Sequence, residues 1–206
     1  MNTLTIGNII NNAFRIGMKN IASILGAVIL WLITIWIPYL NVGTTIALLG
    51  LVVAMSKGGI ISPTEIFDAK YRRNMGEFFL LIAFMWIGVT AGYVFVVIPG
   101  IVISIAWGQA LFLLIDKNLS PTEAMRMSNK LTYGHKWTIF LGQFLLAIIL
   151  IVAIYVVVYI LGIIAEFLGF LAGLIGYFVF MAIMLGAAAY IYGELTREPQ
   201  TGSVEE

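Results

Sequence analysis

Residues 98–137 read IPGIVISIAWGQALFLLIDKNLSPTEAMRMSNKLTYGHKW, and this stretch decides the fold. It begins at a Pro-Gly pair, runs through an uncharged apolar segment to Asp116, crosses a polar segment and returns to apolar sequence at Trp137. Long apolar runs separated by polar segments are typical of a chain that crosses a membrane several times. Shorter versions of the same order precede and follow this stretch.

The composition supports a membrane protein. Of the 206 residues, 62% are hydrophobic and 10% are charged, whereas about a quarter of the residues of a soluble domain are charged. We therefore expect one all-α polytopic membrane domain over residues 1–193 and a short cytoplasmic tail at 194–206. The absence of cysteine excludes disulfides, thiol catalysis and thiolate metal sites. The N-terminus has no signal-peptide pattern.

Three apolar segments are each long enough for two spanning helices. Residues 20–56 and 78–115 contain no charge, and residues 137–193 contain only Glu166. Pro38 and Pro99 lie near the middle of the first two segments, and proline ends helices. The sequence therefore predicts six transmembrane helices in three hairpins, with spans at 21–37, 42–56, 78–98, 101–115, 137–160 and 171–193.

The third apolar segment is longer than the others. Its two helices either tilt strongly or project beyond the bilayer, with residues 162–169 as a turn or a short surface helix. Projection is favoured because Glu166 is less costly in water or headgroups than in hydrocarbon.

An amphipathic or polar helix is expected before each hairpin. In residues 2–19 an apolar stripe (Ile6, Ile10, Ala13 and Gly17) predicts a helix capped by Thr3 or Thr5. This stripe packs either on lipid or on the helix bundle. Residues 62–77 and 120–132 each begin with Ser-Pro-Thr-Glu, which predicts a capped helix start.

The two Ser-Pro-Thr-Glu sequences indicate an internal repeat. Ser62 and Ser120 are 58 positions apart, and the same offset relates Gly76 to Gly134. We therefore expect a repeat of about 58 residues that consists of a polar helix followed by a hairpin.

The positions of the basic residues predict the orientation. With six spans, all eleven Lys and Arg side chains fall on one side, and the other side carries only Glu166. The positive-inside rule then makes both termini and the polar helices cytoplasmic. We expect a prokaryotic cytoplasmic (inner) membrane as the location.

Few residues could carry chemistry. His135 is the only histidine, and its position beside Trp137 suits a membrane boundary better than a catalytic base. Capping and solvation account for Asp116, Glu123 and Glu77 more simply than a metal site does. The spread of basic residues does not favour nucleic-acid binding. We expect no enzyme activity, cofactor or metal.

Polar side chains within the predicted spans form a candidate intramembrane site: Gln109, Gln143, Thr90 and Tyr93. Such groups either bond neighbouring helices together or line a polar path. Small residues at four-residue spacing, such as Gly88 with Gly92 and Gly169 with Gly173, predict close helix packing, which Gly186 and Ala187 to Ala189 extend on the last span.

The opening stretch resembles the YciC-like and glycerophosphoryl diester phosphodiesterase membrane-domain families. They share a Pro-Gly turn, an acidic span end, a Ser-Pro-x-Glu-Ala helix with a later Ser, and a Gly-His-x-Trp return. The matching positions are Pro99, Gly100, Asp116, Ser120, Pro121, Glu123, Ala124, Ser128, Gly134, His135 and Trp137. IPYLNVG at 37–43 and IFD at 66–68 extend the resemblance, which fades after about residue 145.

This resemblance implies a multi-span bacterial or archaeal inner-membrane protein, in which the matching positions have a structural role. The membrane domain of the phosphodiesterase is not its catalytic part, so that activity does not carry over. We expect a non-enzymatic protein of membrane, envelope or lipid homeostasis, or an accessory subunit. Its partners would be membrane lipids, a partner protein or further copies of the chain. The alternative is a small transporter or permease component that uses the four intramembrane polar residues.

Overall fold

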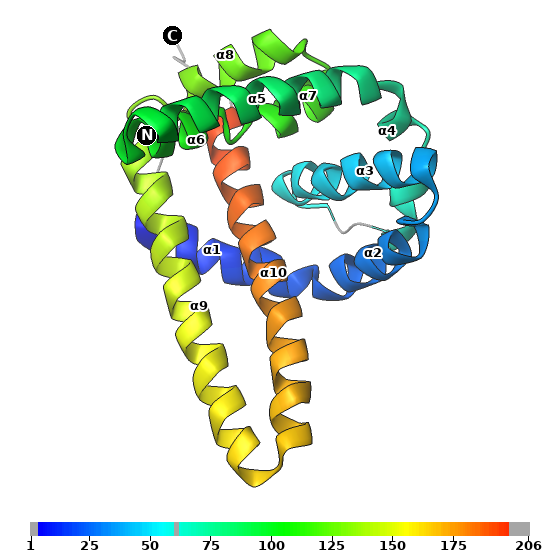
Figure 1. Ribbon diagram of the computed structural model, residues 1–206, viewed down its shortest axis with the longest axis vertical. Coiled ribbons are helices and arrows are strands. Elements are labelled where there is room, and N and C mark those ends of the chain that lie inside the picture. Colours follow the sequence, from blue (N-terminus) through cyan, green and yellow to red (C-terminus); the bar gives the residue numbers. More distant parts are fainter. Residues whose placement is uncertain (1–3, 60–61, 198–206) are drawn as a thin grey trace, which may run out of the picture.

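The computed structural model describes residues 4–59 and 62–197, and the structured segments there are helices (Figure 1). In chain order they are α1 Ile6–Lys19, α2 Ile21–Thr34, α3 Pro38–Ser56, the 3-10 helix η1 Pro63–Phe67, α4 Lys70–Arg73, α5 Met75–Phe95, α6 Val97–Trp107, α7 Ala110–Lys117, α8 Pro121–Thr132, α9 Lys136–Ile164 and α10 Glu166–Thr196.

Five segments of the described chain are long and apolar enough to cross a membrane. They are α3, α5, α6 together with α7, α9 and α10. The predicted span 21–37 is shorter than expected, because α2 has 14 residues and reaches only about 21 Å of a ~30 Å hydrocarbon core. The α1–α2 pair, bent by 65°, would count as a sixth span if it crosses as one unit. The protein is therefore a multi-pass membrane protein by helix length and composition.

The predicted Pro-Gly turn is displaced. α5 ends at Phe95, Val96 is extended, and α6 starts at Val97, so Pro99 and Gly100 lie inside the first turn of α6. The first turn of a helix tolerates proline because its N–H groups have no partner within the helix. The spans predicted at 78–98 and 101–115 are therefore α5 and the α6–α7 pair, with the turn between them at Val96.

The third pair of helices also turns more tightly than expected. Of the two predicted forms of residues 162–169, the structure has the turn and no separate surface helix, and the turn is tight because Ala165 alone separates α9 from α10. Gly162 and Gly169 make this possible, since a Cβ added at Gly169 would lie 2.8 Å from the Gly162 Cα. α9 and α10 run side by side and extend well beyond the other helices (Figure 1).

α1 packs on the protein through a stripe that differs from the predicted one, because Ile9 is buried while Ile6 and Ile10 are only half-buried. Ile9, Ala13 and Gly17 are fully or almost fully buried, and α1 crosses α10, where a Cβ added at Gly186 would lie 2.5 Å from the Ala13 carbonyl oxygen. The predicted cap at Thr5 is confirmed, as its Oγ1 accepts from the Asn8 N–H at 3.2 Å. The alternative cap, Thr3, lies outside the described residues.

The polar helix predicted over 62–77 is broken. η1 ends at Phe67, Asp68 has an extended ψ of 131°, and only the four residues of α4 follow. Ser62 makes no capping hydrogen bond, whereas Ser120 and Glu123 form the expected capping box at the start of α8. The two segments of the proposed repeat thus differ locally, and the repeat stays a prediction.

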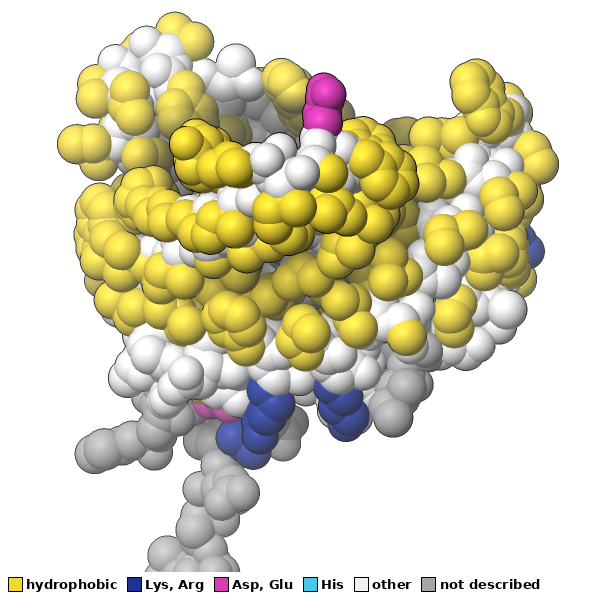
Figure 2. Space-filling model, turned by 90° about the horizontal axis from the view of Figure 1, so that it is seen from below, with side chains coloured by type: hydrophobic (Ala, Val, Ile, Leu, Met, Phe, Trp, Pro, Cys, Tyr) yellow, Lys and Arg dark blue, Asp and Glu magenta, His cyan; other side chains and the backbone are white. Residues whose placement is uncertain are grey.

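α10 joins the two parts of the hydrophobic core. One face of α10, which includes Tyr192, packs with α2, α3 and α7, and another face, which includes Ile183, packs with α1 and α9. Apolar side chains cover most of the face in Figure 2, and the Lys and Arg side chains visible there lie mainly along its lower edge. An apolar exterior with cations on one border fits a membrane-embedded bundle.

Candidate functional site: a charged cavity at the ends of α3 and α7

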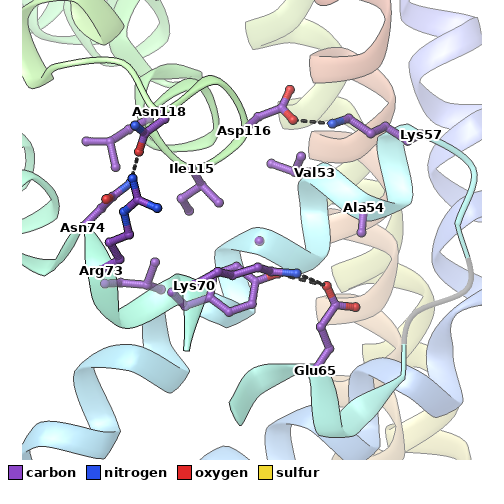
Figure 3. A pocket seen from close by; sticks show the side chains of 14 residues that line it. Val53, Ala54, Lys57, Glu65, Lys70, Arg73, Asn74, Ile115, Asp116 and Asn118 are labelled. Carbon is purple, nitrogen blue, oxygen red and sulfur yellow. Dashed lines mark hydrogen bonds and ion pairs between the residues drawn. The ribbon is translucent and has the colours of Figure 1, made fainter. Parts of the chain in front are cut away.

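A cavity of about 510 Å³ lies where the last turns of α3 and α7 meet α4 (Figure 3). We call it the charged cavity. Its wall is apolar, with Ile46, Val53 and Leu114 buried. Its polar side chains come from five segments, and they are Lys57, Glu65, Lys70, Tyr71, Arg73, Asn74, Asp116 and Asn118.

Asp116 holds three helices together at this cavity. Its side chain is only 10% exposed and forms an ion pair with Lys57, the residue that ends α3. Its Oδ2 accepts a hydrogen bond of 2.7 Å from the Tyr192 hydroxyl of α10. Both carboxylate oxygens therefore have partners, as expected of polar atoms in a nearly buried side chain.

A second ion pair lies across the cavity. The Lys70 Nζ donates to Glu65 Oε1 at 2.8 Å and lies 3.3 Å from Asp68 Oδ2. The hydrogen bond to Glu65 raises the pKa of Lys70 above its ordinary value. Burial, together with the nearby Glu65 carboxylate, raises the pKa of Tyr71 to about 12. The Tyr71 hydroxyl is therefore neutral at physiological pH and donates to Glu65.

The remaining polar groups come from the segments that flank α5 and α7. Asn118 ends α7 in the left-handed region with φ 51°, where asparagine is tolerated, and its Oδ1 accepts from Asn74 Nδ2. Arg73 is exposed and lines the cavity beside this amide pair (Figure 3). Within the described chain Arg73 forms no ion pair, unlike Lys57 and Lys70.

The arrangement of side chains in the charged cavity suits the binding of a ligand. The carboxylates Asp116 and Glu65 already have cationic partners, and one guanidinium remains available at the rim. Arginine forms strong, bidentate hydrogen bonds with phosphate and carboxylate groups. An apolar wall next to a charged rim matches a ligand with one polar and one apolar end.

Among the motif positions from the sequence, Asp116 alone lines this cavity. His135 is half-buried and precedes α9, Trp137 is 57% exposed, and Gly134 has a positive φ of 81° that turns the chain into α9. Glu123 serves the capping box, because its Oε2 accepts from the Ser120 hydroxyl at 2.6 Å. Ser120 and Glu123 thus support the start of α8, and Gly134 supports the turn before α9.

Gln109 and Ser128 meet at the break between α6 and α7. The Ser128 Oγ donates to the Ala106 carbonyl at 2.6 Å and accepts from the Gln109 N–H at 3.1 Å. It thereby satisfies two backbone groups that the break leaves without helical partners. The Gln109 side chain is 5% exposed, and its Oε1 has no hydrogen-bond partner in the described chain.

The other members of the predicted intramembrane site lie in different surroundings. Thr90 and Tyr93 are on the exposed surface of α5, and Gln143 is half-buried on α9. The charged cavity includes none of them, and it does not include Gln109. The four-residue site therefore stays a prediction.

Sequence reasoning missed most of the charged cavity. The sequence predicts only that Lys57, Arg73 and Asn74 lie in cytoplasmic segments, and that Tyr192, the partner of Asp116, lies in the last span. The one available signal was Asp116, a carboxylate at the end of an apolar run. No family model, curated protein or solved structure matches this chain. The family resemblance thus remains a prediction.

Proposed function

We propose that this chain is a non-enzymatic, multi-pass protein of a prokaryotic cytoplasmic membrane. In this proposal the charged cavity holds the polar head of a membrane lipid, and the protein acts in lipid or envelope homeostasis. A role as an accessory subunit is compatible with the same site.

The observation that carries the proposal is the lining of the charged cavity. Arg73 lacks an ionic partner in the described chain and lies at the rim, while the buried side chains of Val53 and Leu114 form the wall. A lipid phosphate would meet the guanidinium, and the upper part of an acyl chain would contact the apolar wall. The engaged carboxylates Asp116 and Glu65 support binding over acid–base chemistry.

Native mass spectrometry of the purified protein, released from nanodiscs of phosphatidylcholine and phosphatidylglycerol, tests this function. We expect the wild type to retain phosphatidylglycerol and Arg73→Gln to retain about tenfold less, because one charge-assisted contact is lost. Arg126→Gln is the matched control, since Arg126 is exposed on α8 and does not line the cavity. Equal retention by the two variants would contradict the proposal.

A further inference from the structure

A second cavity, of about 730 Å³, lies on the other side of the end of α3. α1, the end of α3 and the end of α10 line it, through residues that include Arg15, Lys19, Ser56 and Arg197. We call it the basic cavity. Lys57, the next residue after Ser56, lines the charged cavity, so the end of α3 separates the two sites.

One face of α1 points its polar residues toward this cavity. Asn8, Asn12, Arg15 and Lys19 all line it, and their spacing of four, three and four residues places them on a single stripe of the helix. The buried stripe of Ile9, Ala13 and Gly17 holds α1 against the bundle. The orientation of the polar stripe is therefore set by apolar packing.

The charges that line the basic cavity do not balance. Three cations (Arg15, Lys19 and Arg197) accompany a single carboxylate, Glu194, which pairs with Arg197 at 3.3 Å. Arg15 donates to the neutral Asn12 Oδ1 at 2.6 Å. Lys19 forms no ion pair within the described residues. Like charges one helical turn apart, such as Arg15 and Lys19, repel each other unless an anion lies between them.

Asn20 gives an independent indication of a ligand. Its side chain lines the basic cavity and is 2% exposed. Its Nδ2 donates to the Ile16 carbonyl at 2.9 Å, but its Oδ1 has no hydrogen-bond partner in the described chain. Buried acceptors normally have a donor. The ligand that fits would therefore combine negative charge with a hydrogen-bond donor.

We propose that the basic cavity binds a phosphate group that carries a hydroxyl donor. Arg15 and Lys19 contact the phosphate oxygens, Arg197 adds charge at the rim, and the hydroxyl group donates to Asn20 Oδ1. Inorganic phosphate and the headgroup of phosphatidylglycerol share this chemistry. The site is separate from the charged cavity, so it can fail or hold independently of the proposed lipid-binding function.

The test is calorimetric titration of inorganic phosphate into the full chain in phosphatidylcholine nanodiscs. Arg15→Gln/Lys19→Gln is expected to weaken phosphate binding at least about tenfold. Arg126→Gln/Lys130→Gln removes the same charges from α8, where Lys130 also lies in the last turn of a helix but neither residue lines the cavity. This control shows whether a loss of binding comes only from weaker general attraction between phosphate and a basic protein. It also accounts for the helix dipole, which by itself favours a cation in the last turn of a helix.

A further variant guards against a folding defect. Arg197→Gln changes an exposed side chain at the end of α10 and is expected to weaken phosphate binding. An equal loss in the α8 control, or no phosphate binding by the wild type in phosphatidylcholine, would overturn the proposal.

The lipid composition of the nanodisc identifies the source of the phosphate. If phosphatidylglycerol abolishes the titration with inorganic phosphate, the lipid headgroup occupies the basic cavity. If the titration is unchanged, the natural ligand is a free phosphate compound. Either result supports a phosphate site in the basic cavity. Arg73 lines the charged cavity, so Arg73→Gln is expected to give the same titrations as the wild type in both kinds of nanodisc.

Discussion

Gly186 allows the backbones of α1 and α10 to come into direct contact where the two helices cross. A Cβ there would lie 2.5 Å from the Ala13 carbonyl oxygen and 2.6 Å from the Gly17 N. Because both neighbours are backbone atoms, Gly186→Ala must separate the helices, and we expect a loss of about 1–3 kcal/mol in the free energy of unfolding. Denaturant unfolding in detergent, followed by tryptophan fluorescence, measures it.

Gly173 on the same helix is the matched control. A Cβ there would contact only Val158 Cγ2, at the ordinary distance of 3.8 Å. Gly173→Ala should therefore stabilise the protein by up to about 1 kcal/mol, which is the difference in helix propensity. Equal effects of the two substitutions would refute the close crossing of α1 and α10.

The hydroxyl of Ser128 supports the break between α6 and α7. Ser128→Ala removes the two hydrogen bonds to Ala106 and Gln109 and leaves buried backbone groups unpaired. We expect a loss of about 1–3 kcal/mol in unfolding free energy. Ser104 donates only to Gly100 in its own helix, so Ser104→Ala should cost much less. The same denaturant experiment compares them, and comparable losses would argue against this role for Ser128.

At the scale of a helix, the capping box of α8 predicts a pH dependence. Hydrogen bonds from the Ser120 side chain and backbone lower the pKa of Glu123 below its ordinary value of 4.5. Because the pKa is lower in the folded state, the ionised Glu123 stabilises the fold at pH values above its unfolded pKa. This stabilisation is lost as the pH falls through the folded pKa. Ser120→Ala should raise the Glu123 pKa toward 4.5 and shorten α8.

Carboxyl carbon NMR of the protein in detergent micelles measures this pKa directly. Glu77 is the control carboxylate, since it lies in the first turn of α5 without a Ser-Pro-Thr-Glu sequence. The chemical shift of its carboxyl carbon should be the same in the wild type and in Ser120→Ala. A Glu123 midpoint that is the same in the wild type and in Ser120→Ala would show that the capping box does not form.

Helix boundaries show what local sequence determines. Pro38 and Pro99 both lie in the first turn of a helix, as proline prefers, and not in the connection before it. The predicted start of the second span at residue 42 is therefore four residues too late, because α3 begins at Pro38. The break at Asp68 could not be read from periodicity. There the backbone N–H of Lys70 donates to the Asp68 carboxylate and competes with a continuous helix.

The sites depend on contacts between distant segments, which a single sequence does not reveal. Asp116 was recognisable as an acid at the end of a span, but its partners Lys57 and Tyr192 lie 59 and 76 positions away. Likewise, the polar face of α1 was visible in the sequence, whereas its meeting with the ends of α3 and α10 was not. Hydrophobic patterning fixes which face of a helix is buried but not which helix covers it.

At the scale of the molecule, the arrangement of α1 and α2 bears on the number of spans. Lys19 and Asn20, which precede α2, line a cavity with Ser56 at the end of α3. At the other end of α2, the Asn41 side chain of α3 donates to the Ile35 carbonyl. α2 therefore runs along α3 in the opposite direction. The proposed six-span topology, in which the basic residues and both termini face the cytoplasm, requires α2 to cross the membrane by itself, although it has only 14 residues.

This topology can be tested because the chain has no cysteine, so each introduced thiol is unique. Glu166→Cys lies at the tight turn between α9 and α10 and should react in intact cells with a membrane-impermeant maleimide. Lys70→Cys and Lys19→Cys should react only after the membrane is permeabilised. Reaction of Lys19→Cys from outside, together with protection of Lys70→Cys, would mean that α2 does not cross and that the chain has five spans. Protection of Glu166→Cys in intact cells, together with reaction of Lys70→Cys, would show that the orientation is the reverse of the proposed one.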